Sequence, residues 1–476
     1  MFDSVLIANR GEIALRIIRG CRELGVRSIA VYSDADAGAP HVRAADAAVN
    51  IGPPPSSQSY LLGDRIIEAA LREGAQGVHP GYGFLSEREW FARAVRDAGL
   101  VFIGPPAEAI AAMGSKTAAR TLAVAHNVPV VPGTTESIAD AKRAAEIAAE
   151  FGYPVLLKAA AGGGGKGMRV VREPSEIASS FDAARREAKN AFGDDAVYLE
   201  KYIEGPRHVE IQLIADMHGN AVHLGERECS VQRRHQKVIE EAPSVAVSPE
   251  LRAEMGATAV RAAKAAGYVN AGTCEFLLDR DGKFYFLEMN TRLQVEHPVT
   301  ELVTGIDLVQ WQLRVASGEP LGFTQADIAP KGWAIECRIT SEDPANDFLP
   351  STGRVSFLHL PSGPGVRWDG GIEIGSEVSL HYDPMLAKLI VQAPNRALAV
   401  ERMHRALTEL VVTGIETSRE FHLRVMEDAE FRAGAIEIQW LERRLASLTS
   451  DSGTEDGSRL AALAGALMAE SEAGAR

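Results

Sequence analysis

The sequence predicts a multidomain protein of mixed α/β and α+β structure, and three observations support this prediction. The chain of 476 residues is long enough for about two to four domains of ordinary size. Residues 1 to about 113 alternate short apolar strands with amphipathic helices, the pattern of a parallel sheet. Residues 204 to about 330 instead contain two apolar runs joined by Asp281-Gly282, a strong signal for an antiparallel hairpin.

In the N-terminal region, residues 5–8 are predicted to form the first strand, residues 12–24 a helix and residues 29–32 the next strand. The first turn, NRGE at 9–12, lacks the glycines of a dinucleotide-binding fingerprint. We therefore expect a Rossmann-like parallel sheet that does not bind a nicotinamide cofactor.

The pattern changes between residues 131 and 203. An Ala-, Lys- and Glu-rich helix at 139–150 precedes the glycine-rich segment 155–171, and a second helix at 175–191 precedes a strand at 197–200. This order predicts a small α+β module inserted between larger pieces.

The glycine-rich segment formally contains the pattern GxGxxG, but it lies between two β-like runs and not between a strand and a helix. A Walker A motif is also excluded, because Lys166 is followed by Gly167 and not by Ser or Thr. The segment is therefore predicted to be a hairpin tip whose bare amides approach phosphate oxygens.

The region from 331 to 445 mixes strands such as residues 334–338 with a helix at 397–410. The last segment, 446–476, shifts to Ser, Gly, Asp, Glu and Ala, and we expect a flexible tail or a weak helix.

The hairpin at 273–298 carries the clearest functional signal. With Asp281-Gly282 as a two-residue loop, Arg280 faces Lys283, and Glu275 lies directly opposite Glu288. Leu277 and Phe286 are expected on the same face. Two carboxylates about 5 Å apart repel each other unless a divalent cation lies between them, and Asn290 offers a third oxygen ligand.

Beyond the hairpin, Arg292, Gln294 and Glu296 follow Asn290 at every second residue, so an extended chain projects them into one site. The alternative is a charged outer face of the hairpin. Apolar neighbours of Arg292 and Glu296 favour the site.

Basic residues are placed where phosphate could bind. Lys158 begins the glycine-rich segment, and Lys116 precedes it. A cluster at 231–238, VQRRHQKV, is either an anion site or a solvated basic face. Together, the glycine-rich segment, the paired carboxylates and the lysines indicate an ATP site outside the P-loop class.

Composition restricts the remaining possibilities. A formal charge of −14 argues against general binding to nucleic acid or to an anionic membrane surface. The four cysteines are widely separated and indicate a reducing compartment with no disulfide framework or zinc site. No leader sequence and no apolar run of 18 residues is evident, so we expect a cytoplasmic protein without a membrane anchor.

From residue 1 to about 445, the chain resembles the biotin carboxylases, the ATP-grasp component of biotin-dependent carboxylases. The resemblance rests on long motifs: IANRGEIA at 7–14, HPGYGFLSE at 79–87, MGSK at 113–116, GGGGKGMR at 162–169, EKYIE at 200–204, RHVEIQ at 207–212, RRHQKVIEEAP at 233–243, EMNTRLQVEHPVTE at 288–301 and ECRI at 336–339. It implies an N-terminal pre-ATP-grasp domain (1–113), an ATP-grasp domain (114–330) with a glycine-rich lid (131–203), and a C-terminal biotin carboxylase domain (331–445).

The resemblance also implies the site residues. The ATP site would be lined by Lys116, Lys158, Gly163, Gly164, Gly165, Glu200, Lys201, Ile203, His208, Gln232, His235 and Leu277. Magnesium or manganese, at two sites, would be held by Glu275, Glu288 and Asn290. Bicarbonate would meet Lys237, Arg292, Gln294, Val295 and Glu296, and biotin would meet Arg338, Tyr82 and Gly83. Catalysis would depend on Glu296, Arg338, Lys237 and Arg292.

The implied reaction is ATP-dependent carboxylation of biotin by bicarbonate through carboxyphosphate, the first half-reaction of an acyl-CoA carboxylase. No Met-Lys dipeptide occurs, so we expect the biotin on a separate carrier protein that also visits a separate carboxyltransferase. The family suggests a homodimer. The final acceptor stays open among acetyl-CoA (fatty acid biosynthesis), propionyl-CoA, methylcrotonyl-CoA and pyruvate.

Two alternatives remain at this point. One is another ATP-grasp ligase of the carbamoyl-phosphate or purine type, and the other is a catalytically silent nucleotide-binding protein.

Overall fold

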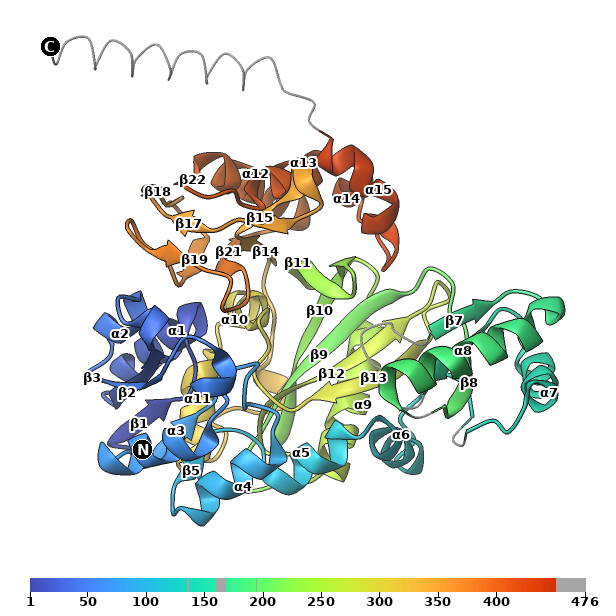
Figure 1. Ribbon diagram of the computed structural model, residues 1–476, viewed down its shortest axis with the longest axis horizontal. Helices are drawn as coiled ribbons and strands as arrows, with labels where there is room; N and C mark the ends of the chain where they lie inside the picture. Colours follow the sequence, from blue (N-terminus) through green and yellow to red (C-terminus); the bar gives the residue numbers. More distant parts are fainter. Residues whose placement is uncertain (135–136, 160–167, 194, 451–476) are drawn as a thin grey trace, which may run out of the picture.

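The computed structural model describes residues 1–134, 137–159, 168–193 and 195–450. Figure 1 shows an N-terminal α/β unit, a large central sheet, a C-terminal unit lying over one end of that sheet and a small module projecting to one side. The chain is therefore built from mixed α/β and α+β pieces, as the sequence predicts.

The N-terminal unit is a five-stranded sheet with the order β3-β2-β1-β4-β5, and all its pairs are parallel. The central strand β1 is buried at every position, as expected for a parallel strand covered on both faces. This confirms the predicted parallel sheet. Its elements are β1 (Ser4–Ile7), α1 (Gly11–Glu23), β2 (Arg27–Ser33), α2 (Pro40–Ala44), β3 (Ala47–Gly52), α3 (Gly63–Arg72), β4 (Gly77–His79), α4 (Glu89–Asp97) and β5 (Val101–Phe102), followed by α5 (Ala107–Gly114) and α6 (Lys116–Ala125).

The central sheet has eight strands in the order β13-β12-β9-β10-β11-β14-β21-β19. It crosses residue 330, the predicted domain boundary, because β11 pairs antiparallel with β14. The two predicted domains therefore share one continuous sheet. Its strands are β9 (Arg207–Ala215), β10 (Ala221–Arg233), β11 (Gln236–Ala242), β12 (Asn270–Leu278), β13 (Phe284–Asn290), β14 (Trp333–Thr340), β19 (Val366–Gly370) and β21 (Met385–Ala393).

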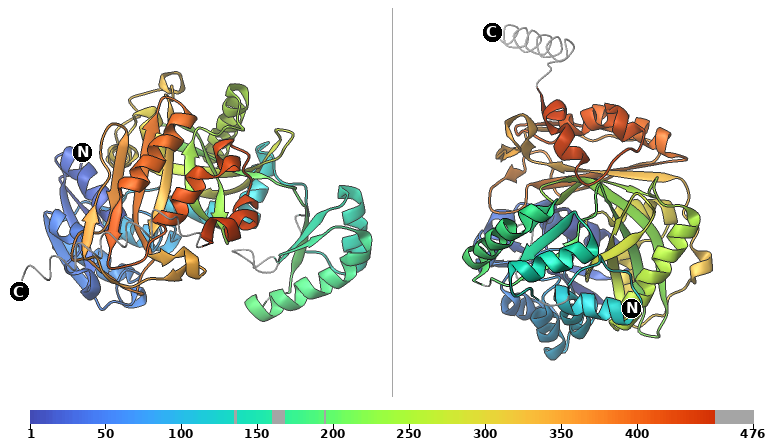
Figure 2. Two further views of the ribbon diagram at one scale, coloured as in Figure 1. Left: turned by 90° about the horizontal axis from the view of Figure 1, so that it is seen from above. Right: turned by 90° about the vertical axis from the view of Figure 1, so that its right-hand side faces the viewer.

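Helices cover this sheet and connect its strands (Figure 2). The α12 helix packs on β14 and β21 around a buried cluster that includes Met403 and Trp440. The helices are α9 (Pro249–Ala265), α10 (His297–Thr304), α11 (Leu308–Ala316), α12 (Arg396–Glu409), α13 (Arg419–Glu427), α14 (Ala429–Arg432) and α15 (Trp440–Thr449). Short strands complete the C-terminal unit: β15 (Glu342–Asp343), β16 (Leu349–Pro350), β17 (Gly353–Arg354), β18 (Phe357–His359), β20 (Glu377–Val378) and β22 (Val411–Thr413).

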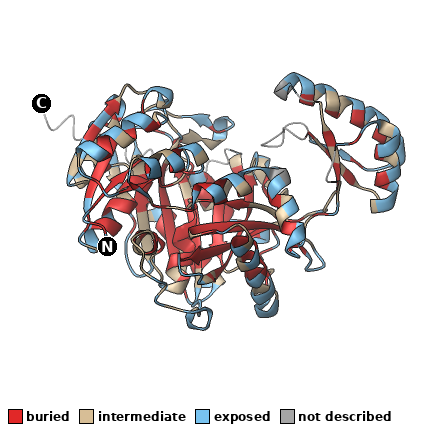
Figure 3. Cartoon of the chain, turned by 90° about the horizontal axis from the view of Figure 1, so that it is seen from below, coloured by how far each residue is buried: buried red, intermediate tan, exposed pale blue. Residues whose placement is uncertain are grey.

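The projecting module is an antiparallel sheet with the order β7-β6-β8. It carries two helices and its own small core (Figure 3). Lys158 pairs with Met168, so two antiparallel strands enclose the glycine-rich segment, as predicted. The glycines 163–165 lie outside the described residues. The elements are α7 (Ala141–Phe151), β6 (Val155–Ala159), β7 (Met168–Val171), α8 (Ile177–Phe192) and β8 (Val197–Lys201).

The β12–β13 hairpin confirms one prediction and corrects two others. Glu275 does lie opposite Glu288. The loop, however, has three residues, because the Asp279 amide donates to the Lys283 carbonyl at 2.8 Å and Gly282 adopts a left-handed conformation with φ +80°. The predicted pairing of Arg280 with Lys283 is therefore wrong.

A bulge restores the register beyond the loop. Phe276 pairs with Phe286, whereas the next pair is Glu275 with Glu288, so Leu287 is an extra residue on β13. Phe286 consequently packs in the core with Phe276 and not beside Leu277, which corrects the predicted face.

The end of the chain also differs from the prediction. Helix α15 continues to Thr449, with Leu448 buried, so the predicted tail cannot begin at residue 446. Residues 451–476 lie outside the described part. Among the described helices, none is both long and apolar enough to cross a lipid bilayer.

Candidate active site

The candidate site lies on one face of the central sheet, where charged side chains from four of its strands meet the N-terminus of α10. Glu210 comes from β9, Lys237 from β11, Glu275 from β12 and Arg338 from β14. Glu296 is the residue immediately before α10. Strand pairing therefore brings together residues that are far apart in the sequence.

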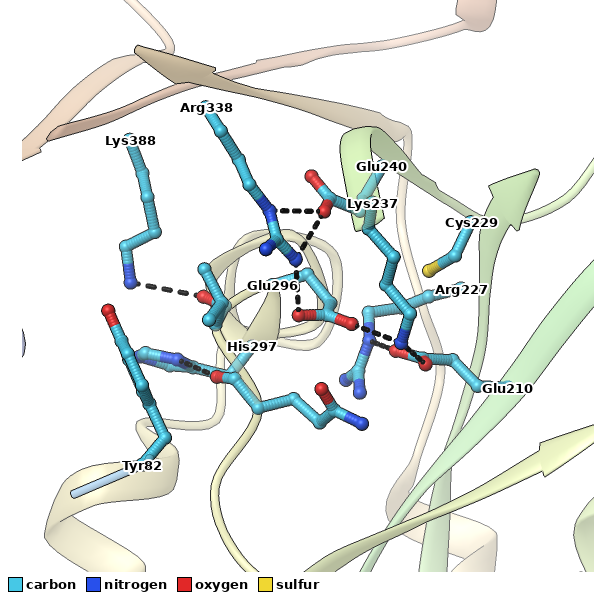
Figure 4. Close-up of polar contacts among 12 residues, drawn as sticks. Tyr82, Glu210, Arg227, Cys229, Lys237, Glu240, Glu296, His297, Arg338 and Lys388 are labelled. Atoms are coloured by element: carbon cyan, nitrogen blue, oxygen red, sulfur yellow. Dashed lines mark hydrogen bonds and ion pairs between the residues drawn. The ribbon is translucent and has the colours of Figure 1, made fainter. Parts of the chain in front are cut away.

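Lys237 is the centre of this cluster (Figure 4). Its Nζ lies 2.8 Å from Glu275 Oε1 and 2.6 Å from Glu296 Oε1, and it also contacts Glu210. Burial opposes the charge of Lys237, but the three carboxylates raise its pKa well above the ordinary value. The side chain is thus held as an ammonium group.

Glu296 is fully buried between two cations. Its second oxygen, Oε2, accepts a hydrogen bond from Arg338 Nη2 at 3.0 Å. Burial alone would raise the pKa of Glu296, but Lys237 and Arg338 hold it well below its ordinary value. Arg338 is fixed in turn by Glu240, which accepts from its Nε at 2.7 Å.

Arg227 orients the Glu210 carboxylate from behind. Its Nε donates to Glu210 Oε1 at 2.5 Å, and its terminal nitrogens donate to Gln212 at 2.6 Å and to Thr273 at 3.0 Å. The guanidinium is completely buried and fully engaged. Its network keeps the floor of the site rigid.

The predicted metal ligands lie together on the hairpin. Glu275 and Glu288 are directly opposite in the register, and Asn290 Nδ2 donates to Glu275 Oε1 at 2.8 Å. Burial would raise the pKa of Glu275, but Lys237 and His208 hold it well below the ordinary value, so the carboxylate is ionised. These hard oxygens suit magnesium or manganese. A divalent ion at Glu275 would replace its contact with Lys237 or with His208 Nε2, which lies 3.1 Å away.

The segment after β13 also enters the site, but it is not extended throughout as predicted, because it bends at Arg292 and forms a turn at Val295 and Glu296. Arg292 Nη2 donates to Asn290 Oδ1 at 3.1 Å, and Gln294 Nε2 donates to Glu275 Oε1 at 3.1 Å. Glu87, from the N-terminal unit, holds Arg292 Nε at 2.9 Å.

Most of the described residues that are predicted to bind ATP lie on the neighbouring part of the sheet or in the projecting module. His208 and Leu277 are paired on β9 and β12, and Leu277 lies on the same face as Glu275. Burial opposes the charge of His208, but Glu275 more than offsets this effect and raises its pKa. Gln232 is buried near the end of β10. Lys116 is the first residue of α6 and lies far from these residues in the sequence.

Within the projecting module, Lys158 pairs with Glu200. Arg120 Nη1, which comes from α6, lies 3.3 Å from the same carboxylate. Lys201 donates to the Gly152 carbonyl at 2.8 Å. Ile203 is half-buried just after β8.

The basic cluster at 231–238 divides into two parts. Arg233 and Arg234 contact Asp347, and the Arg233 guanidinium lies 4.1 Å from the centre of the Phe348 ring. His235 is exposed at the turn between β10 and β11. Within the cluster, Lys237 enters the carboxylate network, whereas the two arginines bind the C-terminal unit.

The biotin residues predicted from the N-terminal unit lie in the loop after β4. Tyr82 is half-buried and its hydroxyl donates to Glu12, and Gly83 is exposed with φ +68°. Figure 4 places Tyr82 and Glu210 on opposite sides of Glu296.

Sequence reasoning missed several residues of this network, because their partners come from distant segments. They are Glu12, Glu87, Glu210, Arg227, Glu240 and Lys388. One signal was present. Lys388 is a charged residue inside an otherwise largely apolar strand, and a buried charge needs partners.

Comparisons with known proteins identify the family of the chain. Three family profiles match consecutive parts of the chain: biotin carboxylase, N-terminal domain (residues 1–110), carbamoyl-phosphate synthase L chain, ATP binding domain (115–324), and biotin carboxylase C-terminal domain (336–443). The central match alone would leave a carbamoyl-phosphate ligase open, but both flanking matches are to biotin carboxylase.

Curated relatives span almost the same length. A biotin carboxylase of Nostoc sp. is 52% identical, and the match covers 93% of this chain and 99% of the relative. A pyruvate carboxylase component from Methanothermobacter thermautotrophicus is 51% identical, and the match covers 93% of this chain and 90% of the relative.

A solved structure has the same fold. It is the biotin carboxylase domain dimer of Hydrogenobacter thermophilus 2-oxoglutarate carboxylase, in complex with MgADP, ADP and bicarbonate. It has a TM-score of 0.87 and 46% identity, and the match covers 95% of this chain and all of that one. The fold, the continuous match and the clustered site together show that the chain belongs to the biotin carboxylase family of ATP-dependent ligases.

Proposed function

We propose that the chain uses ATP and bicarbonate to carboxylate biotin held by a separate carrier protein. The observation that carries this proposal is the row Lys237–Glu296–Arg338, in which one buried carboxylate is shared by two cations beside Glu275. Such a row can bind a small oxyanion at one end and a carbonyl oxygen at the other.

ATP would bind between the projecting module and the central sheet. The groups assigned to it are those named from the family resemblance, with Lys158, His208 and Lys116 offsetting phosphate charge. Glu275, Glu288 and Asn290 would hold magnesium, or alternatively manganese, which neutralises phosphoryl charge when bound.

Bicarbonate would accept hydrogen bonds from Lys237 and Arg292, with Gln294 and Val295 beside it. Glu296 would remove its proton and so generate the nucleophile for the γ-phosphate. The depressed pKa of Glu296 depends on Lys237 and Arg338. An anion that binds these cations competes with Glu296 for them and so increases the proton affinity of the carboxylate.

Attack of the bicarbonate oxygen on the γ-phosphate would form carboxyphosphate and release ADP. Breakdown to carbon dioxide and phosphate would follow, and the phosphate could accept the proton from the biotin nitrogen. Arg338 would stabilise the negative charge that develops on the ureido oxygen, with Tyr82 and Gly83 beside the ring.

The partners follow from this reaction. The biotin would arrive on a carrier protein and leave for a carboxyltransferase. The homodimer is proposed from the family and not from the reaction. Its four cysteines are unpaired and buried, which supports a place in the cytoplasm. The final acceptor is left open, because relatives named for different carboxylases have nearly equal identity.

The proposal is tested with purified protein, ATP, magnesium and labelled bicarbonate. Free biotin should stimulate phosphate release and become labelled. Stimulation by ammonia or glutamine instead would indicate the carbamoyl-phosphate type of ligase. Nucleotide binding without phosphate release would indicate a catalytically silent protein.

A further inference from the structure

Lys388 is a buried charge whose position the reaction scheme above does not explain. It is the charged residue of β21, whose sequence is MLAKLIVQA, and its side chain is 0% exposed. Removing an ammonium group from water costs several kcal/mol unless it is paired and hydrogen-bonded. Its partners therefore indicate why it is there.

These partners come from two other parts of the fold. Lys388 Nζ lies 3.1 Å from Glu12 Oε1, in the first turn of α1. It also donates a hydrogen bond to the main-chain carbonyl of Val295 at 3.0 Å. Glu12 accepts a second hydrogen bond, from the Tyr82 hydroxyl, and the Tyr82 ring centre lies 6.0 Å from Nζ. One lysine thus joins the C-terminal unit, the N-terminal unit and the segment before α10.

Lys388 is also the neighbour of Arg338. The two residues are direct partners in the β14–β21 register, so their side chains leave the same face of the sheet. Figure 4 shows both side chains extending toward the segment that carries Glu296 and His297. Arg338 contacts the Glu296 carboxylate, and Lys388 contacts the carbonyl of the preceding residue.

The hydrogen bond from Lys388 to the Val295 carbonyl also fixes the neighbouring amide of Glu296. The carbonyl of Val295 and the amide of Glu296 belong to one planar peptide group. Holding the carbonyl therefore sets the direction of that amide and the start of the Glu296 side chain. The contact with Glu12 in turn sets the position of the Tyr82 hydroxyl.

We propose that Lys388 and Glu12 are positioning residues for the bicarbonate- and biotin-binding segments, with Lys388 fixing the Val295 peptide and Glu12 fixing Tyr82. This inference rests on the proposed function, in which Val295, Glu296 and Tyr82 adjoin the substrates. Stability alone does not require these charges, because replacing a buried ion pair by apolar or neutral groups of similar volume is often neutral or stabilising.

The test compares Lys388→Met, Glu12→Gln and the double variant with the wild-type protein. KM values for bicarbonate, free biotin and ATP are measured, together with carboxybiotin formed per ADP and the melting temperature. Lys388→Met leaves Glu12 without its cation and could unfold the chain. The double variant removes both charges and therefore decides the question if the single variant fails to fold. Gln392→Met, on the same strand but bonded to the Lys331 carbonyl, is the matched control.

For the folded double variant we expect KM for bicarbonate and biotin to rise about tenfold and carboxybiotin per ADP to fall about tenfold, because small displacements of binding groups have effects of this size or larger. KM for ATP should stay within about twofold of the wild type, since, among the residues that the structure describes, the contacts of Lys388 and Glu12 include none with an assigned ATP residue. The control should behave as wild type.

Wild-type KM values and coupling in the folded double variant would overturn the inference, and so would an equal rise in all three KM values. Failure of the wild-type protein to form carboxybiotin would instead reject the proposed function, so the two failures are distinguishable.

Discussion

Replacing Arg338 by Gln separates the two halves of the proposed reaction. The guanidinium lies 2.7 Å from Glu240 and 3.0 Å from Glu296, and its side chain is only 18% exposed. It is assigned to the biotin oxygen, whereas Lys237 and Arg292 are assigned to bicarbonate. Loss of one such donor to a developing oxyanion typically lowers kcat by about 10²–10³-fold, or about 3–4 kcal/mol.

We therefore expect biotin carboxylation to fall about 10²–10³-fold in Arg338→Gln, and bicarbonate-dependent ATP hydrolysis to fall less than about tenfold. Removing one partner from a buried charge pair also lowers stability, by about 3–5 kcal/mol. Glu240 reduces this loss, because burial raises its pKa to about 7 and it can take up a proton near neutral pH.

Both rates are measured on the same preparation, by labelled carboxybiotin and by phosphate release, after the melting temperature has shown that the variant is folded. Arg396→Gln is the matched control. Arg396 contacts Glu241, the neighbour of Glu240 on β11, at 2.7 Å, and its side chain is 11% exposed. It should lose stability without a change in the ratio of the two rates. An equal loss of both rates in Arg338→Gln would refute the assignment.

Three further predictions concern the same network. Lys237 contacts three carboxylates and is assigned to bicarbonate, which both reactions require. Lys237→Met should therefore lower both rates together, by about 10²-fold or more. Loss of carboxylation alone would contradict the assignment to bicarbonate. Glu275→Gln and Glu288→Gln should each raise the magnesium concentration for half-maximal activity by about tenfold or more, and an unchanged magnesium titration would exclude them as ligands. Glu240 should lower folding stability as the pH rises, since the folded protein keeps its proton between the ordinary pKa of 4.5 and about 7 while the unfolded chain releases it. At about 1.4 kcal/mol per pH unit, this shift in the pKa of Glu240 corresponds to about 3 kcal/mol of folding free energy. Urea unfolding should therefore show that Glu240→Gln gains up to that much stability relative to the wild type between about pH 4.5 and 7.5. A stability difference that stays constant with pH would show that Glu240 is not the group responsible.

The hairpin shows how far sequence reasoning reaches. The pairing of Glu275 with Glu288 is predicted correctly, but through two errors that cancel: the loop is one residue longer than expected, and a bulge at Leu287 restores the register. The three-residue loop includes Gly282 in a left-handed conformation, and the bulge accompanies the packing of Phe276 and Phe286 in the core. Neither is encoded in the alternation of residues along the strand.

The second layer of the site depends on topology. Lys388 and Arg338 are distant in the sequence and meet only because β14 pairs with β21, and Glu12 reaches Lys388 only because α1 packs near that sheet. A lone lysine in an apolar strand signals a buried charge, but it does not identify the partner. Local motifs therefore predicted the residues that we assign to the substrates, whereas the groups that hold these residues required the structure.

The origin of the oxygen in the released phosphate tests the central mechanistic claim most directly. Bicarbonate labelled with heavy oxygen is supplied with ATP, magnesium and biotin, and the phosphate is analysed by mass spectrometry. Because a bicarbonate oxygen attacks the γ-phosphate in our account, each phosphate should carry one labelled oxygen. Phosphate that takes its new oxygen from water would show that the γ-phosphate is hydrolysed directly, and would contradict the account.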